Sequence, residues 1–164
     1  MDSNENTALY AFRRFGNDVL RAAYAGCGSY AEAEDITQEV FLTLHSHPQT
    51  FRDDDHLRAW LLRCAMNRCL NYRKSFRISR TGSLEELPEM PGSPVFSDAE
   101  NELRESLARL PEKYAVVLYL YYYEGYNTRE IGDMLGKSEN TVSSLLRRGR
   151  EKLRIELEEE GVVI

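Results

Sequence analysis

Residues 127–154 read NTREIGDMLGKSENTVSSLLRRGREKLR, and this stretch decides the fold of the C-terminal half. Asn127 and Glu130 have the spacing of a capping box, so we expect a short helix over 128–135 that the next glycine ends. A second helix is predicted from about residue 138 to about residue 158. Both helices carry apolar residues able to pack together, namely Ile131, Leu135, Val142, Leu145, Leu146 and Leu153. The pattern therefore predicts a helix-turn-helix.

The second helix of this pair has polar and basic residues where a helix-turn-helix meets duplex DNA. Its N-terminal residues would face base edges in the major groove, and cations further along would contact phosphates. The candidates for base contacts are Ser138, Asn140, Thr141 and Ser144, and those for phosphate contacts are Arg147, Arg148 and Arg150. Residues 137–154 hold six cations against two acids. The alternative for this stretch is an ordinary helical hairpin.

Residues that interrupt helices and strands divide the rest of the chain into two parts. Residues 79–97 contain three of the five prolines among Gly and Ser, and neither helical nor strand periodicity survives there. This composition predicts a flexible linker. Helical patterns continue on both sides of it. We therefore expect an all-α protein of two small helical domains, over 7–78 and 100–158, joined by a linker over 79–99, with the helix-turn-helix in the second.

Three helices are expected in the first domain. The first ends at the glycines 26 and 28, the second begins after Ser29, which has capping-box spacing to Glu32, and the third covers about 56–76. One face of the second helix is apolar, with Ala33, Ile36, Val40 and Leu44. The other face carries a strip that the fold does not need to bury, formed by Asp35, Gln38, Glu39 and Leu42. We call these four residues the 35–42 strip.

The third helix is strongly basic. Residues 59–80, AWLLRCAMNRCLNYRKSFRISR, contain six cations and no acid. Polar residues recur there at helical spacing, and aromatic residues that could stack on unpaired bases lie between them. The candidates for nucleic-acid contacts are Trp60, Arg63, Asn67, Asn71, Tyr72, Arg73, Lys74 and Arg77. The alternative is a solvated basic face whose aromatic residues belong to the core.

The composition of the chain also bears on whether the protein is a membrane protein, a secreted protein, a metal-binding protein or an enzyme. The 164 residues have a net charge of −6 and no apolar run near the roughly 18 residues of a membrane span. The polar first residues are unlike a signal peptide, so we expect a cytoplasmic protein with reduced cysteines and no membrane insertion. The cysteine and histidine spacings do not fit a zinc site. No phosphate-binding glycine loop or nucleophile–base pair is evident, which predicts no metal, no cofactor and no enzyme.

At these residues the sequence resembles an RNA polymerase sigma factor of the extracytoplasmic-function group. Four stretches carry the resemblance, at residues 33–45, 59–74, 110–142 and 147–154. It implies a transcription initiation factor that binds core RNA polymerase and directs it to promoter DNA. The 35–42 strip matches the family's docking surface for the polymerase. Many relatives are held inactive by an anti-sigma protein, and no residue here indicates whether this chain has such a partner.

The resemblance also implies roles for the two basic helices. Residues 59–77, with the preceding loop 51–56, match the part that recognises and opens the minus-ten element. The 138–150 segment matches the reader of the minus-thirty-five element as duplex. The sequence departs from the family pattern at Asn71, where Asp is usual, at 143–145, where Lys-Ser-Arg is frequent, and at Gly132 and Gly149, where Ala is common.

A free-standing helix-turn-helix regulator that binds duplex operators is the alternative function. Such a regulator would need neither the 35–42 strip nor a second, aromatic-rich basic helix. The charge pattern bears on DNA binding in either case. Because the two basic helices are strongly positive while the whole chain has a net charge of −6, the remaining segments are strongly acidic. We therefore expect the isolated protein to bind free DNA weakly.

Overall fold

The computed structural model describes residues 3–79 and 98–159, with side chains over 7–71 and 103–159. The N-terminal unit consists of α1 (Ser3–Cys27), α2 (Tyr30–Ser46) and α3 (Asp54–Ser79). The C-terminal unit consists of α4 (Asp98–Ala108), α5 (Glu112–Leu118), the π-helix η1 (Tyr119–Tyr123), α6 (Thr128–Leu135) and α7 (Glu139–Glu159). The all-α expectation is confirmed. Apart from its end residues, the predicted linker lies outside the described residues.

Local sequence signals account for the helix ends. The Ser29 hydroxyl accepts from the Glu32 amide at the start of α2, at 3.3 Å. Asn127 and Glu130 form the complete capping box of α6, with bonds of 2.8 and 3.0 Å. Gly136 ends that helix with a φ of +67°, a left-handed conformation that glycine adopts without a Cβ penalty. Helices α2 and α6 therefore begin, and α6 ends, where their own capping residues satisfy free backbone groups.

Residues 119–123 form a π-helix that continues directly from α5. Its wider turn places Tyr119 and Leu120 in the core and leaves Tyr121 and Tyr122 exposed. The rings of Tyr119 and Tyr123 stack with centroids 5.1 Å apart. Burial, followed by the charge of Glu124, raises the pKa of Tyr119.

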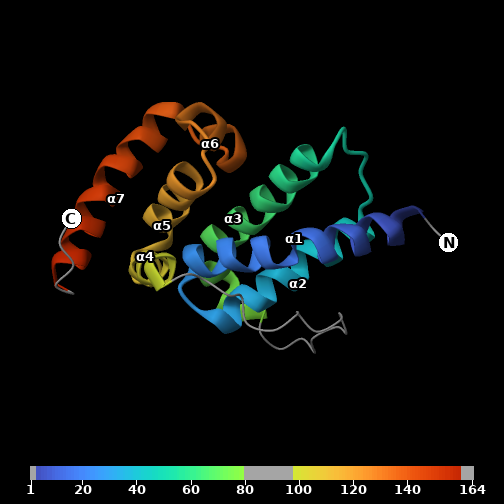
Figure 1. Ribbon diagram of the computed structural model, residues 1–164, viewed down its shortest axis with the longest axis horizontal. Helices are drawn as coiled ribbons and strands as arrows, with labels where there is room; N and C mark the ends of the chain where they lie inside the picture. The colour runs from blue at the N-terminus through green and yellow to red at the C-terminus, as the bar shows by residue number, and fades with distance from the viewer. Residues whose placement is uncertain (1–2, 80–97, 160–164) are drawn as a thin grey trace.

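The two units pack against each other and share one hydrophobic core (Figure 1). Helices α4 and α5 contact α1, and α5 and α6 contact α3. Polar bonds also cross this interface. Tyr24 Oη donates to Glu105 Oε1 at 2.6 Å, and Arg58 Nη1 lies 2.6 Å from Glu124 Oε1. In the part of the chain that the structure describes, no helix is both long enough and apolar enough to span a membrane.

Candidate functional site

The 35–42 strip, called the α2 strip from here on, lies on the face of α2 that points away from the core. Ala33, Ile36 and Val40 are fully buried on the opposite face, as expected. Within the strip, Glu39 is exposed, whereas Asp35, Gln38 and Leu42 are half-buried. The strip thus combines one accessible carboxylate with a partly exposed leucine, a combination suited to a protein partner.

Glu39 has an intramolecular partner that the sequence did not indicate. Its Oε2 lies 3.3 Å from Arg68 Nε of α3, and Arg68 Nη2 donates to Thr43 Oγ1 at 2.7 Å. One cation of the basic helix therefore points toward α2. Because the Glu39 side chain is 54% exposed, solvent screens this ion pair and it adds little stability.

An aromatic cluster forms where the loop before α3 meets its first turns. The Phe51 ring packs edge-on against Trp60 at 5.9 Å and against His56 at 5.3 Å. Hydrogen bonds hold the loop, because Asp53 Oδ1 accepts from the His56 amide at 2.8 Å and His56 Nδ1 accepts from the Arg52 amide at 3.1 Å. The structure therefore joins the predicted loop and Trp60 into one surface. The predicted stacking residue Trp60 is half-buried.

Asn67, predicted to contact bases, is occupied by the C-terminal unit. Its amide nitrogen donates to the Arg63 carbonyl at 2.9 Å and to the Met134 carbonyl of α6 at 2.8 Å. Those two bonds use both of its N–H donors. Asn67 and Asn71 line a cleft of about 470 Å³ between α3 and the C-terminal unit, with Lys113 and Lys137 also on its walls. Arg63 remains exposed.

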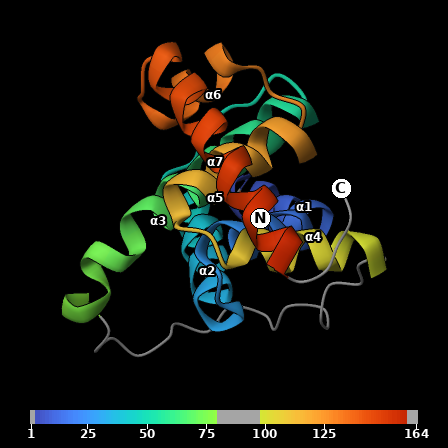
Figure 2. The ribbon, with the colours of Figure 1, turned by 90° about the vertical axis from the view of Figure 1, so that its left-hand side faces the viewer.

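The rest of the predicted α3 surface lies beyond this cleft. Helix α3 continues to Ser79 and extends past the other helices (Figure 2). The side chains of Tyr72, Arg73, Lys74 and Arg77 lie outside the described residues. The basic helix is thus confirmed as a helix, and the roles of these four residues stay predictions.

Glycine 132 allows α6 and the turn before α7 to approach closely. A Cβ at this position would lie 2.6 Å from the Lys137 carbonyl oxygen. The Lys137 amide donates back to the Gly132 carbonyl at 2.9 Å, and Thr128 Oγ1 donates to Glu139 Oε1 at 3.0 Å. These contacts fix α6 relative to α7, which is what a helix-turn-helix needs in order to present its second helix.

The N-terminus of α7 has two residues that serve the helix itself. Ser138 Oγ accepts from the Thr141 amide at 3.1 Å and donates to Thr141 Oγ1 at 2.8 Å. Ser138 therefore acts as the cap, while the Thr141 hydroxyl, which accepts from Ser138, keeps its own proton for donation. Asn140 is exposed and Ser144 is half-exposed, as a base-reading surface requires.

The cations of α7 are not equivalent. Arg147 and Arg148 are exposed, and no ion pair to either is present within the described ranges. Arg150 Nη1 instead donates to Tyr122 Oη at 3.1 Å. Arg154 pairs with Glu151 and Glu158, which raises the pKa of its guanidinium. Arg147 and Arg148 are therefore the cations best placed for phosphate among the predicted ones.

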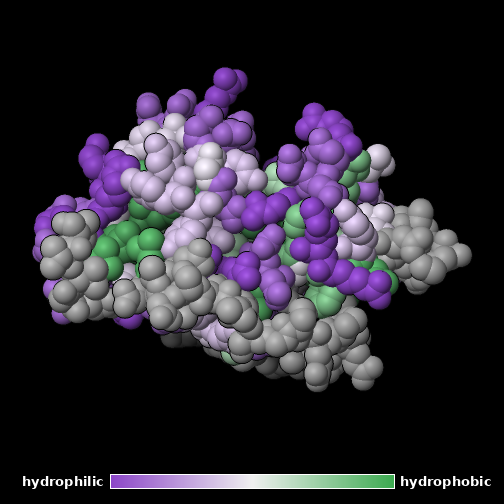
Figure 3. Space-filling model, in the orientation of Figure 1, coloured by the Kyte–Doolittle hydropathy of each residue, from purple (hydrophilic) through white to green (hydrophobic). Residues whose placement is uncertain are grey.

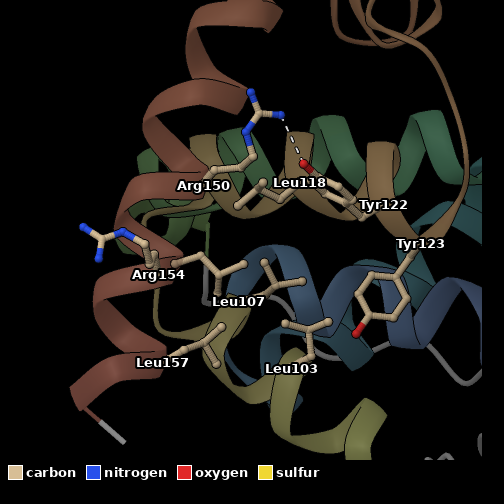
Figure 4. A pocket seen from close by; sticks show the side chains of 9 residues that line it. Leu103, Leu107, Leu118, Tyr122, Tyr123, Arg150, Arg154 and Leu157 are labelled. Carbon is tan, nitrogen blue, oxygen red and sulfur yellow. Dashed lines mark hydrogen bonds between the residues drawn. The ribbon is translucent and has the colours of Figure 1, made fainter. Parts of the chain in front are cut away.

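Sequence reasoning missed an apolar groove in the C-terminal unit. Figure 3 shows hydrophobic surface between α7 and α4, and Figure 4 shows the side chains that enclose it. The groove has a volume of about 340 Å³. Its apolar lining comes from Leu103, Leu107, Leu118, Tyr122, Tyr123, Leu153 and Leu157. The available signal was the leucine spacing 153–157, which continues the apolar face of the last helix past the helix-turn-helix.

Comparison with known proteins places both basic helices in matched regions. The family model Sigma-70 region 2 matches residues 11–77, and Sigma-70, region 4 matches residues 100–153. The ECF RNA polymerase sigma factor SigL of Mycobacterium tuberculosis is 34% identical over 150 residues, which cover 88% of this chain and 85% of SigL. SigW of Bacillus subtilis, also named an ECF RNA polymerase sigma factor, is 27% identical, with 87% and 84% covered.

Proposed function

Because this chain belongs to the extracytoplasmic-function group of RNA polymerase sigma factors, we propose a division of its initiation function among three surfaces. The α2 strip binds core polymerase. Residues 59–77 of α3, with the Phe51–His56 loop, recognise and open the minus-ten element. The exposed N-terminal half of α7 reads the minus-thirty-five element. The protein works in the cytoplasm, without cofactor or catalysis of its own, and directs polymerase to specific promoters.

The observation that carries this division is the coexistence of three separate surfaces in one small chain. An accessible carboxylate and leucine lie on α2, an aromatic and basic surface on α3, and two exposed arginines on α7. A free-standing helix-turn-helix regulator would need only the last of them. The family membership and the first two surfaces therefore favour the initiation factor over that alternative.

The observed packing bears on when the α3 surface can work. The Asn67 amide donates to the Met134 carbonyl, so a base that accepts from this amide must first break a contact with α6. The packed form is thus poorly suited to reading the minus-ten element. Polymerase binding that separates the two units would remove this competition. This requirement supports the expectation that promoter binding depends on a partner.

Run-off transcription tests the proposal directly. Purified protein and core polymerase are incubated with a library of genomic fragments, and the transcript starts are sequenced. We expect starts that depend on the added protein and share two upstream elements. If no fragment gives a transcript that depends on the protein, the proposal is wrong.

A pull-down with core polymerase tests the α2 strip. Glu39→Lys should weaken binding, whereas Glu34→Lys, the same charge change on α2 outside the strip, should bind normally. Because Glu39 pairs with Arg68, the double variant Glu39→Lys/Arg68→Glu restores an internal ion pair. If the double variant regains full affinity, Glu39 acts through the fold and does not contact polymerase.

A further inference from the structure

Two buried thiols lie together where α1 ends against α3. Cys27 is 3% exposed and Cys69 is 1% exposed. Cys27 Sγ donates to the Ser29 carbonyl at 3.3 Å, and Cys69 Sγ lies 3.5 Å from the Ala23 carbonyl. Cys69 Sγ therefore lies against the last turn of α1, within interaction range of the Cys27 side chain. All three cysteines of the chain are thiols, and Cys64 is half-buried elsewhere on α3.

The pair lies under the C-terminal unit. A Cβ at Gly26 would lie 3.0 Å from Cys69 Sγ and 3.2 Å from Val116 Cγ2 of α5. Helices α1, α3 and α5 therefore meet at this point. Since α5 belongs to the C-terminal unit, the cover over the thiols depends on the contact between the two units.

The surroundings keep these thiols in their unreactive form. The neighbouring Cys27 side chain and burial raise the pKa of the Cys69 thiol, and the carboxylates of Glu112 and Glu32 add to the effect. The thiolate is the nucleophile in thiol oxidation, so a protonated buried thiol reacts slowly. Departure of α5 would remove both the Val116 side chain and the Glu112 charge. Separation of the units would therefore make the pair more reactive.

We propose that Cys27 and Cys69 form a reversible disulfide site, oxidised by a hydroperoxide when the C-terminal unit moves away from α1 and α3. One thiolate attacks the terminal oxygen of the hydroperoxide, the O–O bond breaks, and a sulfenic acid forms together with one water from hydrogen peroxide, or one alcohol from an alkyl hydroperoxide, which takes up the released proton. The second thiol displaces the sulfenic hydroxyl, which leaves as a second water. Two thiols lose two electrons and the peroxide is reduced. The bond lies within the N-terminal unit and does not tie the two units together.

Mass spectrometry of the full chain tests the site. The reduced protein is treated with hydrogen peroxide, quenched in acid and digested without reductant. We expect a loss of about 2 Da, a peptide pair linking Cys27 to Cys69, and reversal by dithiothreitol. Cys64→Ser should keep this product, whereas Cys27→Ala and Cys69→Ala should each lack it. A disulfide through Cys64, or only sulfinic and sulfonic products at Cys69, would overturn the proposal.

The rate of oxidation tests the dependence on opening. Glu124→Gln removes one charge of the Arg58–Glu124 pair, in which the Glu124 side chain is 6% exposed, and so weakens the contact between the units. We expect the disulfide to form about fivefold faster or more in this variant. Arg154→Gln, which breaks only the exposed pairs on α7, is the matched control and should oxidise like the wild type. Equal rates in Glu124→Gln and wild type would show that opening does not control the site.

Discussion

At the scale of single residues, the two glycines that depart from the family pattern, Gly132 and Gly149, lie in different surroundings. A Cβ at position 132 would press on the backbone carbonyl of Lys137 at 2.6 Å, which a turn cannot easily move. A Cβ at position 149 would lie 3.1 Å from Leu118 Cδ1 and 3.3 Å from Tyr114 Cβ, contacts that a shift of a few tenths of an ångström relieves. Glycine is thus required by packing at position 132.

This difference predicts unequal changes in stability for the same substitution at the two positions. Gly132→Ala should destabilise the protein by about 1–2 kcal/mol, because the strain exceeds the gain in helix propensity. Gly149→Ala should stay within about 1 kcal/mol of the wild type, since propensity offsets a small displacement of Leu118. Urea unfolding monitored by circular dichroism measures both. A stabilised Gly132→Ala variant would contradict the close approach of α6 and the turn.

At the scale of elements, α6 depends on its capping box. The helix has only eight residues, so its own hydrogen bonds cannot hold it without caps and tertiary contacts. Asn127→Ala should cost about 1 kcal/mol, and Asn127→Asp should cost much less, because a carboxylate can still accept from the Glu130 amide. The unfolding midpoints of the two variants measure this difference, and equal losses would show that the cap is not the source of the stability.

Helix α7 presents two kinds of arginine, and their DNA contacts should differ accordingly. Arg148→Ala should weaken binding to promoter duplex by the polymerase complex, lower the salt dependence by about one ion, and leave the sequence preference unchanged. Arg154→Ala should have little effect, because Arg154 pairs with Glu151 and Glu158. Affinity against salt concentration and a selected-site logo are the measurements. A changed logo for Arg148→Ala would mean that it reads bases.

At the scale of the whole molecule, the Tyr24–Glu105 bond links the two units and should make stability sensitive to alkaline pH. Burial and this hydrogen bond raise the pKa of Tyr24 to about 12. Between about pH 10 and 12 the unfolded chain binds fewer protons than the folded one, so stability falls as pH rises. Tyr24→Phe should reduce the decline measured by urea unfolding across this range. An unchanged decline would show that Tyr24 is not its source.

Local chemistry explains why much of this molecule could be predicted from its sequence. Capping residues, breakers and apolar periodicity act over a few neighbouring positions, so the helices, their ends and the two basic helices followed directly. The α2 strip also followed, because one face of a helix can be identified by spacing alone. The π-turn at 119–123 did not, since its hydrogen-bond register is set by which tyrosines the core accepts.

The tertiary structure alone decided how these elements use their side chains. It placed Arg68 against Glu39 and joined Asn67 to the Met134 carbonyl. It also formed the apolar groove beside α7 and brought Cys27 and Cys69 together near α5. Each of these contacts joins positions that are far apart in the chain. Their formation depends on the angle and distance at which whole helices pack, and no local spacing in the sequence carries that information.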